Sequence, residues 1–391
     1  MEVEEIQGIG FLPRDLIIDI LSRLPVKILC QLKCVSKRWC SLISFDPHFK
    51  DLHCIRSKRN PRLLSSRYDY IFNFTSMKFE SNVNFTVIDV FSRSFYNNFT
   101  EHVPDAGCIT ISCCNLACLI AYKTIHVCNP STQEFVKLPD LRGRPFDPIV
   151  GFGYLSSANL YKLALLSIRG YIYDENVDVR EIGDDVDYWC QIFTIAEGGP
   201  IYGSWIDIGD LPCRVEKQNG VSVNGEIYWM SYQRSHAAEG KKIVSLDLSK
   251  DQFSTICFPQ GDLDPSSRVM GLLELKGFLG FANYMSEIST LDIWMLKDGT
   301  NHIWVKECSI DLFPVNAYTE ILGFIPINDC DGQILIWSPG ESLLYYYNIK
   351  TENLSAVEEL NVQGPASLGL YIDSFVSLGT GLRLRNLLLD A

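Results

Sequence analysis

Three cysteines within eleven residues raise the question of a metal site near the start of the chain. They are Cys30, Cys34 and Cys40, and two histidines and another cysteine follow them: His48, His53 and Cys54. A structural zinc ion takes about four such ligands in a tetrahedron. One helix face would bring Cys30 and Cys34 together, but Cys40 would then point elsewhere, and the stretch has no C-x-x-C pair. We therefore favour packing residues over zinc ligands. The lysines between them are too few to favour a DNA-reading helix.

A second group of thiols lies further along the chain. Five cysteines crowd a 21-residue span that also holds His126: Cys108, Cys113, Cys114, Cys118 and Cys128. One interpretation is a metal site or a reactive thiol. The other, which we favour, is that strands of a reduced protein bury cysteine as a small apolar side chain. No G-x-S-x-G, phosphate-binding glycine loop or H-E-x-x-H motif occurs. We predict no catalytic residue, no metal and no cofactor, and hence a protein that is not an enzyme.

Charge divides the chain into two parts. The 391 residues carry a net charge of −13, which argues against general nucleic-acid binding. The first 62 residues have a net charge of +4 and the remainder −17, so the composition changes near residue 60. We predict a helical unit over residues 8–55, a linker over 56–67 and a second unit over 68–380.

The compartment follows from the cysteines and from hydropathy. The first ten residues are acidic and polar, unlike an export signal, and no stretch approaches the roughly 18 apolar residues of a membrane span. Fourteen cysteines in such a chain are expected to stay reduced. We predict no membrane association and a cytoplasmic and/or nuclear location.

Residues 11–25 predict a helix with more apolar surface than a small core requires. Pro13 suits the first helical position, and Pro25 ends the helix. The main apolar positions, four residues apart, are Leu12, Leu16, Ile20 and Leu24. Ile17 and Leu21 lie beside this row. Because a bundle of about fifty residues is marginal alone, an exposed apolar row marks a surface that binds another protein.

Further short helices are predicted up to about residue 55. Residues 26–43 carry an apolar face with spacings of 4, 3, 4 and 3, at Ile28, Leu32, Val35, Trp39 and Leu42. We expect a break in this face near Ser36. Asp46 as N-cap and Pro47 at the first helical position begin the next helix. The unit is therefore predicted as three or four helices.

The helical unit resembles an F-box. The matching positions are Leu12, Pro13, Leu16, Ile20, Leu24, Pro25, Val35, Ser36, Lys37 and Trp39, at the spacing of that family. The resemblance implies docking on a Skp-type adaptor, which joins the chain to a cullin–RING ubiquitin ligase. It also implies which residues bind the adaptor: Leu12, Pro13, Leu16, Ile20, Leu24 and Pro25. By the same resemblance, Val35 and Trp39 hold the helices together and contribute to the edge of that surface.

From about residue 68 the sequence predicts short strands. Runs rich in Val, Ile, Tyr, Phe and Trp alternate with turns of Gly, Asn, Asp, Ser and Pro. Turns centred on Lys250, Asp298 and Lys350 lie about 50 residues apart, which is the repeat of a four-stranded β-propeller blade. We predict six blades, with five or seven as alternatives. Residues 371–378 are expected to pair with the first strands after residue 68 and to close the ring. The fold class is thus a small helical F-box followed by an all-β propeller.

Segments of the second unit resemble, in order, the F-box-associated domain of plant F-box proteins, a family that includes the S-locus F-box proteins. They include CCNLACL (113–119), VCNPSTQEFVKLP (127–139), GFGYLSSANLYKLALL (151–166) and VNGEIYW (223–229). The resemblance implies the substrate-recognition subunit of an SCF (Skp–cullin–F-box) ubiquitin ligase, with a still unidentified protein substrate on the propeller. The alternative is an adaptor-bound scaffold that acts outside ubiquitin transfer.

Residues 173–187 form an acidic run, with seven Asp or Glu and one arginine. We favour a solvated insertion between strands, since charge runs are usually exposed loops. The sharper hypothesis is that this run helps to recruit a basic partner.

Overall fold

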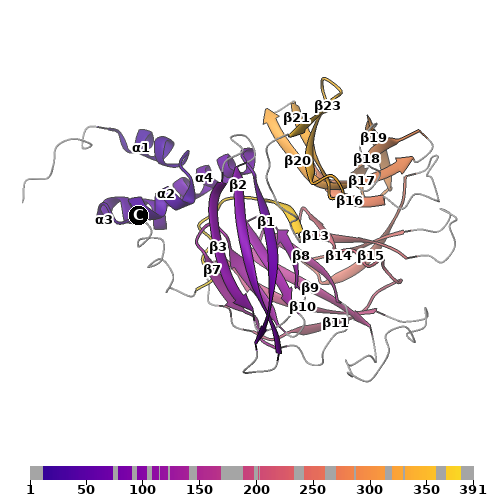
Figure 1. Cartoon of the computed structure of the whole chain (residues 1–391), viewed down its shortest axis with the longest axis horizontal. Helices are drawn as coiled ribbons and strands as arrows, with labels where there is room; N and C mark the ends of the chain where they lie inside the picture. The colour runs from indigo at the N-terminus through magenta and orange to yellow at the C-terminus, as the bar shows by residue number, and fades with distance from the viewer. Residues whose placement is uncertain are drawn as a thin grey trace, which may run out of the picture.

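The computed structural model consists of four helices followed by a six-bladed β-propeller (Figure 1). It describes residues 12–73, 78–89, 95–103, 108–113, 115–121, 124–140, 148–168, 188–197, 201, 203–232, 242–259, 270–285, 288–312, 319–328, 331–357 and 367–379, and every statement below concerns these residues. The acidic run 173–187 and Cys114 lie outside them. None of the described helices is long and apolar enough to cross a membrane.

The helical unit contains α1 (Arg14–Leu21), α2 (Val26–Leu32), α3 (Lys37–Phe45) and α4 (Pro47–Arg59). Ser36 caps α3 by accepting a hydrogen bond from the Trp39 N–H at 3.1 Å. Asp46 caps α4 in the same way, with the Phe49 N–H at 3.0 Å, and Pro47 follows at the first position. The expected break near Ser36 and the expected start of the last helix are therefore both present, because each cap satisfies a backbone donor that the helix leaves unpaired.

The four helices enclose a small core of their own. Its buried members are Ile17, Ile18, Leu21, Leu29, Ile43 and Phe49. Phe375, from the far end of the chain, packs against this cluster. The helical unit therefore draws part of its packing from the last described segment of the propeller.

Each blade is a four-stranded antiparallel sheet. Blade one holds β1 (Arg62–Asn73), β2 (Lys78–Asp89), β3 (Phe95–Val103) and β24 (Ser367–Tyr371). Blade two holds β4 (Cys108–Cys113), β5 (Leu116–Ala121), β6 (Ile125–Asn129) and β7 (Glu134–Lys137). Blade three holds β8 (Ile149–Leu155), β9 (Leu160–Ile168), β10 (Tyr188–Ala196) and β11 (Ile206–Asp210).

The remaining three blades follow in chain order. Blade four holds β12 (Val221–Val223), β13 (Glu226–Met230), β14 (Lys242–Asp247) and β15 (Gln252–Cys257). Blade five holds β16 (Met270–Leu275), β17 (Phe278–Met285), β18 (Thr290–Asp298) and β19 (Ile303–Asp311). Blade six holds β20 (Glu320–Asn328), β21 (Asp331–Ser338), β22 (Leu343–Asn348) and β23 (Asn353–Val357). The predicted count of six is confirmed.

The ring is closed by β24, the last strand that the structure describes. The innermost strands β24, β4, β8, β12, β16 and β20 contact one another in sequence around the ring. β24 pairs with the start of β1, from Arg62 opposite Tyr371 to Ser66 opposite Ser367. Closure by the C-terminal end was expected, but the closing strand is 367–371 and its partner lies before residue 68. Residues 372–378 leave the ladder because their polar groups bond to blade two and to the helical unit instead.

The expected linker over residues 56–67 is occupied by regular structure. α4 continues to Arg59 and β1 begins at Arg62, so only Asn60 and Pro61 lie between helix and blade. The basic residues that suggested a linker are Arg56, Lys58 and Arg59, in the last turn of α4. Cations there complement the negative end of the helix dipole.

Candidate functional site

The first helix presents two apolar faces. Ile17, Ile18 and Leu21 point into the helical core. On the other side three large apolar side chains remain exposed to solvent: Leu12 (43%), Leu16 (49%) and Ile20 (49%). Pro13 precedes the helix and is exposed as well. A residue spacing of four keeps Leu16 and Ile20 on one side of α1, and Leu12 is exposed two residues before the helix begins. We call these three exposed residues the apolar strip.

The other residues expected at the adaptor surface divide into two groups. Val35, in the turn before α3, is 66% exposed. Leu24, Pro25 and Trp39 are half-buried, and Leu24 and Trp39 pack against the helical core. Val35 and Trp39 therefore differ in environment, although the resemblance gives them one role.

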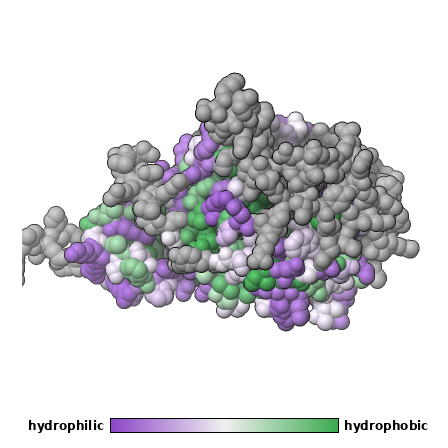
Figure 2. Space-filling view, turned by 90° about the horizontal axis from the view of Figure 1, so that it is seen from below, coloured by the Kyte–Doolittle hydropathy of each residue, from purple (hydrophilic) through white to green (hydrophobic). Residues whose placement is uncertain are grey.

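Sequence reasoning missed two exposed apolar side chains of the helical unit. Phe45, at the end of α3, is 76% exposed, and Ile55 on α4 is 53% exposed. Ile28 on α2 is also exposed, at 39%. Figure 2 shows apolar and polar surface side by side on the part of the molecule where the helices lie. Helical spacing indicates that such residues share a face, but only packing decides which face turns inward.

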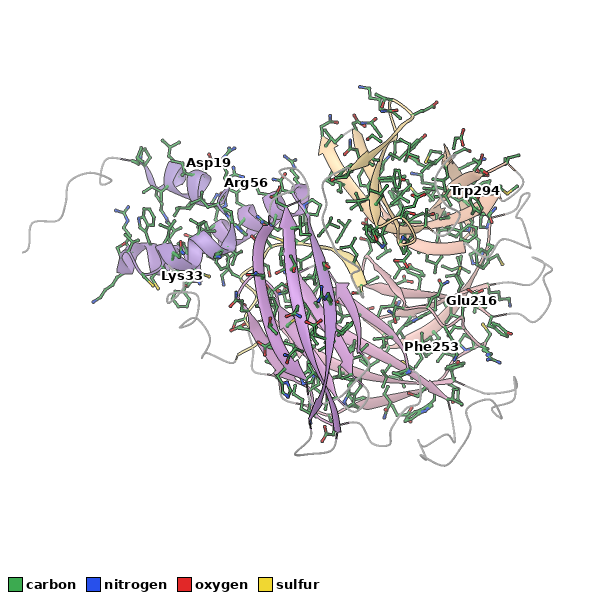
Figure 3. The ribbon with its side chains drawn as sticks, in the orientation of Figure 1. Asp19, Lys33, Arg56, Glu216, Phe253 and Trp294 are labelled. Atoms are coloured by element: carbon green, nitrogen blue, oxygen red, sulfur yellow. The ribbon has the colours of Figure 1, made fainter. Side chains whose placement is uncertain are left out.

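Ion pairs hold α1 against α4 and leave the apolar row uncovered. Arg56 on α4 donates to the Asp19 carboxylate and, at 2.5 Å, to the Asp19 carbonyl oxygen, while Arg23 pairs with Asp19 at 3.2 Å. Figure 3 shows Asp19 and Arg56 approaching each other from their two helices. Hydrogen bonds from Arg23 and Arg56 lower the pKa of Asp19. Arg14 pairs with Asp46. The pKa of Asp46 is lowered mainly by the hydrogen bond from the Phe49 N–H and to a smaller extent by Arg14.

The thiols that first suggested a metal are spread over different environments. Cys30 is buried, Cys40 is partly buried, and Cys34 and Cys54 are exposed. Burial raises the pKa of the Cys30 thiol to about 11. His53 is buried, and its Nε2 lies 3.2 Å from the Leu24 carbonyl oxygen. Among the residues that the structure describes, no group of three His, Cys, Asp or Glu side chains has an arrangement that could hold a metal ion.

The second group of cysteines forms part of the propeller core. Cys113, Cys118 and Cys128 are buried in blade two. Burial raises the pKa of the Cys118 and Cys128 thiols far above the ordinary value, so both stay protonated. His126 stacks on Phe135, with the ring centroids 4.9 Å apart. These residues pack the blade, and the side chain of Cys108 lies outside the described set.

A polar cluster joins the helical unit to the propeller. The Asp373 carboxylate accepts a hydrogen bond from the Val26 N–H, at the start of α2, at 3.0 Å. It also pairs with Arg62, the first residue of β1, at 3.6 Å, and accepts from the Ser131 hydroxyl in blade two. The side chains of Arg62 and Asp373 are only 10% and 4% exposed. No sequence pattern pointed to this cluster, because its members lie up to 347 residues apart.

The fold and the apolar strip together define a class of protein: a small helical unit with an exposed apolar strip, fixed to a six-bladed β-propeller. Comparison with protein-family models agrees with this architecture. Residues 10–51 match the F-box domain, and residues 62–367 match the F-box associated beta propeller domain. The chain belongs to the family of F-box proteins with an F-box-associated propeller.

Three curated relatives from Arabidopsis thaliana are similar to most of this chain. F-box protein At3g07870 is 28% identical over 322 residues, which cover 78% of this chain and 74% of the relative. F-box protein At1g30790 is 26% identical over 384 residues, covering 90% of each chain. F-box protein At1g52495 is 24% identical over 362 residues, covering 89% of this chain and 80% of the relative. The particular likeness to S-locus F-box proteins stays a prediction.

Proposed function

We propose that this chain is the substrate-recognition subunit of an SCF ubiquitin ligase. The helical unit binds a Skp-type adaptor, and the propeller binds a protein substrate. In this function the chain forms and breaks no bond itself; it raises the local concentration of substrate lysines near an E2 enzyme held elsewhere in the complex. Family membership supports the general role.

The observation that carries the proposal is the exposed apolar strip: Leu16 and Ile20 lie on a helix whose other face is already buried, and Leu12 lies just before that helix. Three large apolar side chains in a row are costly to leave in water, at about 25 cal/mol per Å². The Asp19–Arg56 ion pair joins α1, which carries Leu16 and Ile20, to α4. We assign the adaptor contact to Leu12, Pro13, Leu16, Ile20, Leu24 and Pro25, with Val35 and Trp39 at its edge.

Substitution of the strip tests adaptor binding. The double variant Leu16→Asp, Ile20→Asp should weaken the affinity for a recombinant plant Skp-type adaptor by at least about 100-fold. The reason is that burial of each apolar side chain contributes about 1.5–3 kcal/mol to the free energy of binding, and both contributions are lost. Titration calorimetry on the folded proteins measures the change. Ile288→Asp is the matched control, because Ile288 is exposed on the propeller at 63%. An unchanged affinity in the double variant would contradict the assignment.

The same double variant separates a ligase subunit from a scaffold. Because the variant does not bind the adaptor, it should still bind its substrates, but these substrates should not be ubiquitinated. Quantitative proteomics of cells carrying either form should therefore show proteins that are enriched on the variant and that rise in abundance. If adaptor and cullin co-purify with the wild type but no protein rises in abundance with the variant, the adaptor-bound scaffold is the better description.

A further inference from the structure

The segment that follows the closing strand connects the two parts of the molecule. This junction segment, residues 372–379, is not part of any sheet. Asp373 and Phe375 face the helical unit, whereas Val376 and Leu378 pack into the core between blades two and three.

Blade two holds one side of the junction segment. Asn129, fully buried at the end of β6, donates from its amide nitrogen to the carbonyl oxygens of Ser374 at 3.1 Å and Val376 at 2.7 Å. Glu134 accepts from the Ser377 hydroxyl at 3.0 Å and from the Leu378 N–H at 2.7 Å. The segment is therefore fixed to the propeller independently of its contacts with the helices.

The helical unit holds the other side. The Phe375 ring lies against His53 and Phe49, with centroids 5.2 Å and 6.3 Å away. The Lys33 ammonium lies 4.8 Å from the centre of the same ring, a cation–π distance. Figure 3 shows Lys33 on the helical unit, at the side away from Asp19. The contacts of Phe375 thus reach both α4 and the turn after α2.

The partners of Asp373 come from three units: α2, blade one and blade two. A buried ion pair adds little net stability, because desolvation offsets most of the attraction, but the loss of one partner is costly. Asp373 and its partners therefore favour one orientation of the helical unit on the propeller, since a rotation of the helices would leave a buried charge or N–H group without its partner.

We propose that Asp373 is a positioning residue, which with Phe375 fixes the orientation of the helical unit on the propeller. The consequence rests on the function proposed above: the direction from the adaptor to the bound substrate is set by this junction. Asn60 and Pro61 join α4 directly to β1. The junction segment is a second connection between the helical unit and the propeller, formed by the other end of the chain.

Hydrogen exchange on the full chain in complex with the Skp-type adaptor tests the junction. Asp373→Ala should speed exchange at the start of α2 by at least about tenfold, because the Val26 N–H loses its acceptor. Asp373→Asn, which keeps an acceptor oxygen, should show a smaller increase, and Phe375→Ala should speed exchange in α4. Ser377→Ala is the control, since the Ser377 hydroxyl bonds to Glu134 in blade two and to the Gly379 N–H. Exchange in β17 and β18 should not change in any variant. Unchanged exchange at α2 in Asp373→Ala would overturn the proposal, and so would a general rise that includes blade five.

A second readout reports orientation. In a reconstituted cullin–RING ligase, the chain's own propeller lysines should accept ubiquitin, and mass spectrometry identifies which ones do. Asp373→Ala should spread ubiquitin over more lysines at an unchanged total rate and with unchanged adaptor affinity. The same set of lysines as in the wild type would overturn the positioning role. If the wild type fails to bind the adaptor, the proposed function fails, while the exchange experiment on the chain alone still decides whether the junction holds.

Discussion

At the scale of single residues, His53 shows how burial fixes a protonation state. Both ring nitrogens have partners: Nε2 lies 3.2 Å from the Leu24 carbonyl oxygen, and Nδ1 lies 3.4 Å from the Ser57 hydroxyl. This pattern suits a neutral ring, with Nε2–H donating and Nδ1 accepting. Burial lowers the pKa of His53, and the nearby Asp373 carboxylate opposes this change only in part.

The lowered pKa predicts a loss of stability in weak acid. The unfolded chain takes up a proton below the ordinary histidine pKa of about 6.5, whereas the folded chain does so only at lower pH. The free energy of unfolding should therefore fall as the pH drops from about 7 towards the folded pKa, by about 1.4 kcal/mol for each pH unit that separates the folded pKa from the unfolded one. Urea unfolding at several pH values measures this slope, and His53→Leu should remove most of it. An equal slope in both proteins would show that other groups are responsible.

At the scale of elements, the same turn recurs in four blades. Asn129, Asp247, Asp298 and Asn348 each end a third strand. The side-chain oxygen of each accepts from backbone N–H groups in the turn, as for Asn348 with Lys350 at 3.0 Å and Thr351 at 2.9 Å. Four residues later the chain adopts a positive φ, at Gln133, Asp251, His302 and Glu352. Asn and Asp form such turns because their short side chains replace a backbone acceptor.

Removal of the acceptor should weaken the blade. Asn348→Ala should lower the free energy of unfolding by about 1 kcal/mol, since the N–H groups of Lys350 and Thr351 lose their partner within the turn. Asn348→Asp keeps the oxygen and should stay close to the wild type. Thermal or chemical unfolding of the three proteins measures the effect. Equal stability of Asn348→Ala and wild type would mean that the turn forms without its side chain.

These turns also explain which parts of the structure could be predicted from sequence. Turn chemistry and helix caps are local, so the residues that form them lie within about five positions of one another. The blade repeat and the start of α4 were predicted from them. The apolar strip at Leu16 and Ile20 was predicted because helical spacing is local too. The junction at Asp373 was not, because its partners Val26, Arg62 and Ser131 come from distant parts of the chain. Register at the ring closure was missed for the same reason.

At the scale of the whole molecule, the two ends of the propeller depend on each other. β24 supplies the innermost strand of blade one, whose other three strands come from residues 62–103. Tyr371 ends β24 fully buried, and its hydroxyl donates to Asn129 Oδ1 at 2.8 Å and accepts from the Ser131 N–H at 3.1 Å. Burial raises the pKa of Tyr371 far above its ordinary value, so this hydroxyl keeps its proton. The closing strand is thus locked into blade two as well as blade one.

Removal of the closing strand should therefore open the ring. A chain that ends at residue 366 loses the strand partner of Arg62–Ser66 and the buried ring of Tyr371, which together should cost more than about 3 kcal/mol. It should also expose the edge of β1 and associate with itself. Addition of a synthetic peptide of residues 367–379 should raise the unfolding temperature again and reverse the self-association, because the peptide supplies both the strand and the junction segment. Thermal unfolding and light scattering, with and without the peptide, measure both effects. If the shortened chain unfolds at the wild-type temperature, or if the peptide changes nothing, closure by β24 does not hold the propeller together.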